Sequence, residues 1–135
     1  MPNNSAPLRL SGTNTQHVIE ITNIHYLGHG AYTSLINVQS NGFSCEKEFS
    51  FDNDEYFINK LREVLTHQTG DAELMGLESD NYLKIQPFGP DTFLISGLIM
   101  EAQPLTQSLE FAFTTRYPLI EKFVTEFSEI VRTNT

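Results

Sequence analysis

Apolar and polar residues alternate with a period of two through most of the chain, a pattern typical of half-buried β-strands. Residues 8–10 are expected to form no more than a short edge strand. The turn residues Asn41-Gly42 and Gly89-Pro90-Asp91 favour tight connections between neighbouring strands. Segments rich in β-branched and aromatic residues predict strands at 17–26, 32–38, 43–51, 72–77, 82–88, 92–100 and 107–114.

The strand predicted at 43–51 alternates most cleanly. One of its faces carries apolar side chains interrupted by Lys47, and the opposite face carries serine and glutamate. We expect the apolar face to meet a core and the polar face to meet water or a partner. The apolar set is Phe43, Cys45, Phe49 and Phe51, and the polar set is Ser44, Glu46, Glu48 and Ser50.

The period changes to that of a helix in two places. Asp52 is expected to cap a helix whose third residue is Glu55 and which ends near residues 68–70. A last helix is expected from Tyr117 or Pro118 to Arg132. Each helix has an apolar stripe, Phe57, Leu61, Val64 and Leu65 in the first and Ile120, Phe123, Val124, Phe127 and Val131 in the second.

This succession of strands, helix, strands and helix, with short connections, predicts the α+β class. We expect one antiparallel β-sheet of about six to seven strands, with two helices packed on one face. Segment 92–100 is apolar on both faces and is expected to be a central strand covered on both sides. Residues 1–16 are expected to be a partly flexible N-terminal segment and residues 17–135 a single domain. No repeat of 20–50 residues is visible.

Composition narrows the classes of function. Among 135 residues, 17 acidic and 8 basic side chains give a formal charge of −9, which disfavours binding to nucleic acid or to an anionic membrane. Ten Phe and five Tyr indicate a chain that folds. The single cysteine, Cys45, excludes an intramolecular disulfide, and residues 1–12 lack the apolar run of a signal peptide. We therefore expect a cytoplasmic protein.

The negative charge is concentrated in the middle of the chain. Residues 45–80 contain ten acidic and three basic side chains, a net −7. The sequence therefore suggests an anionic docking surface, although a solvated face that protects sheet edges explains the charges equally well. The candidate partner-binding residues are Glu46, Glu48, Asp52, Asp54, Glu55 and Glu73.

No catalytic, cofactor-binding or metal-binding motif is recognisable. His25 and His29 have a spacing that would place them on one face of a helix, but they span a strand end and a glycine turn. Cys45 lies among phenylalanines and is expected to be a buried, inert thiol. We therefore expect no catalytic residues, no cofactor and no metal.

The order of motifs resembles that of WapI-type immunity proteins, a group of small bacterial proteins. The resemblance runs from about Asn41 to Val131, roughly two thirds of the chain. It is carried by an Asn-Gly turn and by the segments DEYFINKLREVL, FLISGLI, SLEFAF and RYPLIEKFVTEFSEIV. It implies a cytoplasmic protein that binds and neutralises a cognate toxin domain, often a basic nuclease, and it implies no catalytic residues. The first 16 residues match nothing in that pattern.

Charge and resemblance together favour a non-enzymatic inhibitor that covers a cognate, basic toxin. A homodimer is also compatible with the sequence. The alternatives are a small-molecule or peptide-binding module with an apolar pocket, and an uncharacterised enzyme with a site around His25 and His29. A closed cavity would favour the binding module, and histidines converging in a cleft would favour the enzyme.

Overall fold

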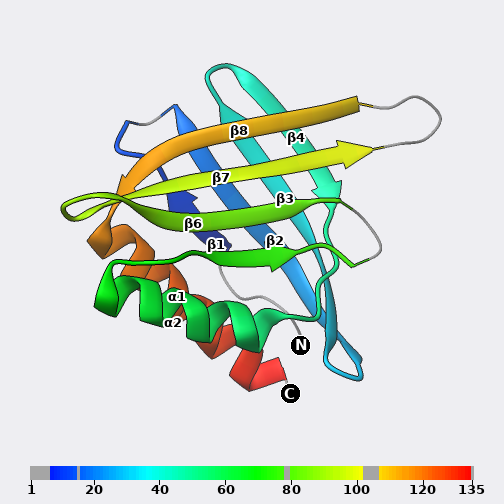
Figure 1. The fold of residues 1–135 in the computed structure, drawn as a ribbon. Helices are drawn as coiled ribbons and strands as arrows, with labels where there is room; N and C mark the ends of the chain where they lie inside the picture. The colour runs from blue at the N-terminus through cyan, green and yellow to red at the C-terminus, as the bar shows by residue number, and fades with distance from the viewer. Residues whose placement is uncertain (1–6, 15, 78–79, 102–106, 135) are drawn as a thin grey trace.

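The strands form two antiparallel sheets of four strands each (Figure 1). The computed structural model describes residues 7–14, 16–77, 80–101 and 107–134. The first sheet contains, in chain order, β1 (Leu8–Ser11), β2 (His17–Gly28), β3 (Ala31–Ser40) and β4 (Phe43–Glu48). The second contains β5 (Ala72–Met75), β6 (Tyr82–Gly89), β7 (Thr92–Glu101) and β8 (Gln107–Arg116). Helix α1 (Asp54–His67) follows the first sheet and α2 (Tyr117–Asn134) follows the second, so four strands and a helix occur twice.

The predicted α+β class is confirmed, and the predicted single sheet of six to seven strands is wrong. Every strand pairs with its neighbour in the chain, and this local pairing stops where α1 separates β4 from β5. The predicted strand 43–51 also breaks, because β4 ends at Glu48. Phe51 forms backbone bridges to Tyr32 on one side and to Gly76 on the other. It is therefore a link between the two halves of the chain.

The helices lie against each other along one side of the molecule, not together on one face of a single sheet (Figure 1). Helix α1 packs on α2, on the edge strand β5 and on β6. Helix α2 packs on α1, on the edge strand β1 and on β8. Each helix therefore contacts the edge strand of the sheet formed by the other half of the chain.

The core is a continuous cluster of buried apolar side chains from both sheets and both helices. Phe127 of α2 lies at its centre, with its ring 5.8 Å from that of Phe51, 5.9 Å from Phe57 and 6.0 Å from Phe123. Aromatic pairs at these separations stabilise a core beyond the area that they bury.

Leu8 and Leu10 of β1 are also buried. They belong to the segment 1–16 that was expected to be partly flexible. Residues 1–6 and 15 of that segment lie outside the described residues.

Three expectations about burial are wrong, and in each case the position of the strand in its sheet is the reason. Phe43 was expected to face the core but is 68% exposed, since β4 is an edge strand and Phe43 directly follows the turn at Asn41-Gly42. On β7, Leu94 and Leu98 are half-buried, so this strand is fully covered on one face only. Cys45 is half-buried, not buried as expected, again because β4 lies at an edge.

Candidate partner-binding cleft

A cleft of about 540 Å³ lies where α1 begins. In Figure 1 the start of α1, the tip of the β2–β3 hairpin and the end of α2 meet on this side of the molecule. We call it the α1 cleft. It is lined by Tyr26, Gly30, Tyr32, Asp52, Asn53, Asp54, Glu55, Tyr56 and Val131.

The position of the cleft is set by Asn53, which is the N-cap residue of α1. Asp52 was expected in that position. The side chain of Asn53 makes no capping bond. Its Nδ2 donates a hydrogen bond to the carbonyl oxygen of Glu73 (2.9 Å), and its Oδ1 accepts one from the N–H of Met75 (3.3 Å). An aspartate has no amide donor for the first of these bonds, which explains why the asparagine stands at the helix start.

Asp54 supplies a carboxylate to the lining of the cleft. This residue is only 5% exposed, which is unusual for an acidic side chain. Burial raises the pKa of Asp54 above its ordinary value, and the nearby charges of Glu55 and Asp52 raise it further, while a hydrogen bond from its own backbone N–H lowers it. The described residues give Asp54 no ion pair. Burial therefore disfavours the charged form of this carboxylate, and the hydrogen bond from its own N–H offsets only part of that cost.

Three tyrosines also line the cleft. The rings of Tyr26 and Tyr32 lie 5.1 Å apart. The hydroxyl of Tyr26 accepts a hydrogen bond from the N–H of Gly30 (3.1 Å), and that of Tyr32 donates to the carbonyl of Val131 (3.4 Å). Burial, together with the charge of Asp54, raises the pKa of Tyr32 to about 12, so this hydroxyl keeps its proton. Tyr26 and Tyr56 are 40% and 64% exposed, which places aromatic surface at the rim.

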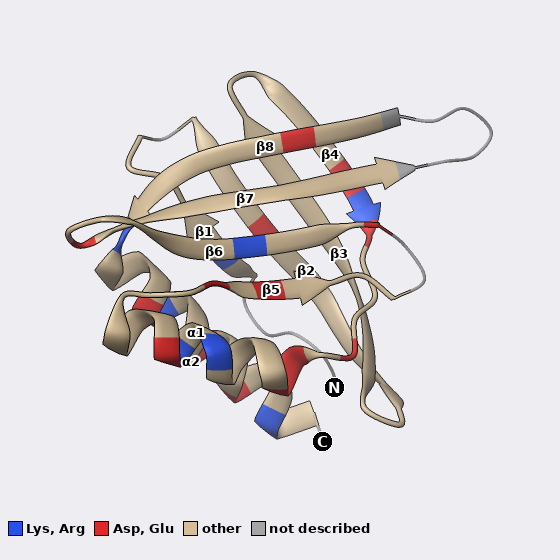
Figure 2. Ribbon diagram, in the orientation of Figure 1, with Lys and Arg blue, Asp and Glu red and all other residues tan. Residues whose placement is uncertain are grey.

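Three of the six predicted partner-binding residues, Asp52, Asp54 and Glu55, come together in the cleft. Glu73 lies beside it on β5, where its backbone oxygen binds Asn53. Glu46 and Glu48 do not line the cleft. They lie on the exposed face of β4, and Figure 2 shows acidic segments along β4, in the loop after it and at the start of α1. The predicted residues thus lie partly in and beside the cleft and partly on β4, where Lys47 stands between the two glutamates.

The tyrosines of the cleft were not predicted as site residues. Tyr26 and Tyr32 lie in a hairpin far from the acidic run, and Val131 is close to the other end of the chain. No local pattern relates these three segments. His25 and His29, the histidines of the enzyme alternative, are exposed and do not line the cleft.

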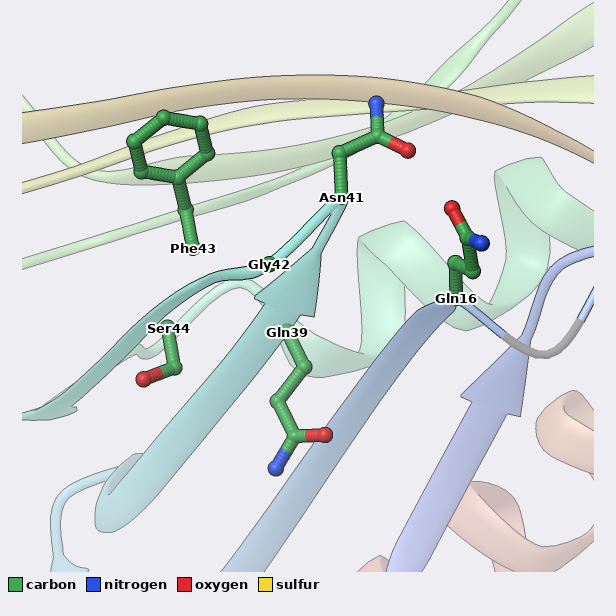
Figure 3. Close-up of a pocket in the computed structure, with 6 residues that line it drawn as sticks. All are labelled: Gln16, Gln39, Asn41, Gly42, Phe43 and Ser44. Atoms are coloured by element: carbon green, nitrogen blue, oxygen red, sulfur yellow. The ribbon is translucent and has the colours of Figure 1, made fainter.

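A wider hollow, of about 660 Å³, lies at the turn between β3 and β4 (Figure 3). Its side chains do not converge. In Figure 3, Gln16, Asn41 and Phe43 point to one side of the ribbon, whereas Gln39 and Ser44 point to the other. Groups that point apart cannot contact one ligand together, so the α1 cleft is the stronger candidate site.

Two further features bear on function. Among the described residues, no three His, Cys, Asp or Glu side chains gather in a way that could hold a metal ion. Neither α1 nor α2 combines the length and the apolar character needed to cross a membrane.

Comparison with known proteins gives little similarity. No protein-family model matches the chain, and no curated protein matches it. Among solved structures, the plant transcriptional regulator PBF-2 is similar over 96% of this chain and 82% of its own, with a TM-score of 0.49 and 10% sequence identity. The function of the cleft therefore has to be inferred from its own residues.

Proposed function

We propose that the protein is a non-enzymatic, immunity-type inhibitor that binds and neutralises a cognate, basic toxin domain. The observation that carries this proposal is the set of carboxylates Asp52, Asp54 and Glu55, which share the α1 cleft without an ion pair in the described residues. Burying a carboxylate is costly unless a cation compensates it. A basic partner would supply that cation on binding.

The surrounding charge supports a basic partner. Glu46, Glu48 and Glu73 extend the acidic surface away from the cleft, and the whole chain carries −9. Such a field accelerates the encounter with a basic protein, by about 10- to 1,000-fold in steered complexes. It repels nucleic acid, whose phosphates are negative.

The sequence resemblance to WapI-type immunity proteins implies a toxin domain as the class of partner and the cytoplasm as the place of the interaction. Inhibition then requires only that the bound protein cover the active surface of the toxin. No chemical step on the side of the inhibitor is needed, in keeping with the absence of a recognisable catalytic motif in the sequence.

The shape of the cleft bears on the alternative of a small-molecule or peptide-binding module. Its volume falls within the range of ligand sites, roughly 300–1,000 Å³. The rim residues Tyr26 and Tyr56 are exposed, which leaves the cleft open to solvent. An open, acidic cleft favours a side chain that protrudes from another protein over an enclosed small molecule.

An affinity capture from the source organism tests the proposal. The protein is immobilised, and the retained polypeptides are eluted with a salt gradient and identified by mass spectrometry. We expect a basic protein in stoichiometric amount, eluted by salt and retained weakly by the double variant Asp52→Lys/Glu55→Lys. The control is Glu63→Lys, which reverses one charge at an exposed α1 position outside the cleft and is compared with each single reversal, Asp52→Lys and Glu55→Lys. Capture of no basic protein would contradict the proposal.

Association kinetics then test the wider surface. Charge reversal at Glu46 and Glu48 should slow association with the captured partner and flatten its salt dependence, since steering charges act mainly on the association rate. Unchanged kinetics would remove these two residues from the binding surface while leaving the cleft in place.

A further inference from the structure

We infer that the α1 cleft receives one cationic side chain, a lysine or arginine that protrudes from the partner, and that this side chain pairs with Asp54. The inference rests on the proposed function, because it specifies what the basic partner places in the cleft. It assigns to Asp54 the central role, and to Asp52 and Glu55 a supporting one at the entrance.

The burial of Asp54 is the first argument. A surface carboxylate is hydrated and needs no partner, but Asp54 is 95% covered, lines the cleft and has no ion pair in the described residues. Two more carboxylates, Asp52 and Glu55, add negative charge to the same space. An ammonium or guanidinium group that enters the cleft meets a carboxylate already stripped of much of its water, where charge pairing is strong.

The tyrosine walls are the second argument, and they are independent of the charge. Lysine and arginine have apolar stems that pack along hydrophobic surface while the charged end reaches its partner. The exposed rings of Tyr26 and Tyr56 provide such a surface at the rim, and aromatic faces also attract cations. A metal ion would use neither ring, and the described residues offer no cluster able to hold one.

The rigidity of the cleft is the third argument. The hydrogen bonds of Asn53 to β5 hold the first turn of α1, and the ring of Tyr32 stacks on buried Phe51 with centroids 5.5 Å apart. The hydroxyl of Tyr32 is directed to the carbonyl of Val131. A site formed before binding loses little conformational entropy when a side chain enters, which favours a strong central contact.

A titration with small probes tests the inference without the partner. Nα-acetyl-arginine amide, Nα-acetyl-lysine amide and the uncharged Nα-acetyl-citrulline amide are added to the isotopically labelled protein, and amide chemical shifts are followed by NMR. We expect shifts that cluster at residues 26–32 and 52–56 with either cationic probe. The citrulline probe should cause none of them. The cationic probe that binds more tightly identifies the side chain that the cleft prefers.

Variants of the cleft test which side chains bind the cationic probes. Asp54→Asn, which keeps the shape of the side chain, should weaken binding of the cationic probes by about tenfold or more. The exposed variant Tyr56→Ala should weaken it without any change to the buried carboxylate. Glu63→Gln, which removes one charge from α1 outside the cleft, should leave binding unchanged. Equal affinity in Asp54→Asn and the unchanged protein, or shifts that cluster elsewhere, would overturn the inference.

The outcome separates this inference from the proposed function. If affinity capture yields a basic partner whose binding is unaffected by Asp54→Asn, the protein is an inhibitor of basic proteins and the cleft is not its central contact. If the probes bind at Asp54 and no basic protein is captured, the cationic subsite stands and the toxin-directed function fails.

Discussion

The side-chain amide of Asn53 donates a hydrogen bond from Nδ2 to the backbone oxygen of Glu73, and so joins the first turn of α1 to the edge of β5. Together with the bond from Met75, it replaces the next strand that this edge lacks. This side chain therefore adds to the backbone bridges of Phe51 in holding the start of α1 against the second sheet.

Replacing Asn53 with alanine should lower the free energy of unfolding by about 1–3 kcal/mol, because both backbone groups of β5 lose their partner. Urea denaturation measures the change. Asn59→Ala, at an exposed α1 position, is the control and should cause no comparable loss. Equal stability of Asn53→Ala and the unchanged protein would mean that the bridge contributes nothing.

Asp54 makes stability depend on pH in a direction opposite to that of most paired carboxylates. Its folded-state pKa is raised above the ordinary value of 3.8, mainly by burial. The folded protein thus holds the proton more tightly than the unfolded chain, so the stabilisation is present below pH 3.8 and is lost as pH rises through the raised pKa. Asp54→Asn should remove this loss and be at least as stable as the unchanged protein at pH 7.

Urea denaturation from pH 3 to pH 8 measures the effect, with Glu63→Gln as the control for loss of one α1 charge. If the free energy of unfolding depends on pH in the same way in Asp54→Asn and in the unchanged protein, ionisation of Asp54 does not lower stability. We expect Asp54→Asn to be more stable and to bind the cationic partner less tightly, because a buried carboxylate that serves binding lowers the stability of the unbound protein.

Tyr32 should be the tyrosine that ionises at about pH 12, because burial and the charge of Asp54 disfavour its anion. Absorbance at the tyrosinate band after rapid mixing to alkaline pH measures the step before the chain unfolds. Tyr32→Phe should abolish the step near pH 12, whereas the exposed-site variant Tyr56→Phe should keep it. Survival of the step in Tyr32→Phe would assign it to another group.

Gly97 is required on the inner face of β7. A Cβ atom at this position would lie 2.6 Å from the carbonyl oxygen of Tyr82 and would overlap the ring of Phe111, which covers the glycine from β8. Gly97→Ala should therefore destabilise the protein by about 1–3 kcal/mol. Gly89→Ala is the matched control, because a Cβ there meets nothing within 4 Å. Thermal unfolding measures the effect: the midpoint should fall in Gly97→Ala and stay unchanged in Gly89→Ala. Equal midpoints in the two variants would contradict the close packing at Gly97.

Phe43 and Phe49 offer a comparison within one stretch of chain. Phe49 is buried and Phe43 is exposed, although the alternation pattern gave both the same face. Phe49→Ala should cost about 3–5 kcal/mol. Phe43→Ala should change the free energy of unfolding by no more than about 0.5 kcal/mol. Equal losses of stability in chemical denaturation would contradict the burial of Phe49 and the exposure of Phe43.

Local patterns predicted the elements well, because hairpins and helices depend on neighbouring residues. The helix beginning near Asp52 and ending near residues 68–70 is α1, which runs from Asp54 to His67. The last helix begins at Tyr117, as the pattern indicated. The division into two sheets could not be predicted in this way, since alternation shows which side of a strand is apolar but not which strands pair across a helix.

The site shows the same limit. The acidic run of residues 52–55 was visible in the sequence because its members are neighbours. Tyr32 and Val131 join it only through the packing of α2 against the hairpin, a contact between distant parts of the chain. The sequence thus indicated the charge of the surface, and the tertiary structure adds its aromatic wall.

The contacts of the two helices have a consequence for synthesis on the ribosome. The edge strand β1 is covered by α2, which is synthesised after all eight strands, and α1 packs on β5, which is synthesised after α1. A nascent first half therefore exposes both an open strand edge and the apolar stripe of its helix until the second half has emerged. Folding should be completed only after translation of α2, and two fragments divided between α1 and β5 should regain structure only when they are mixed.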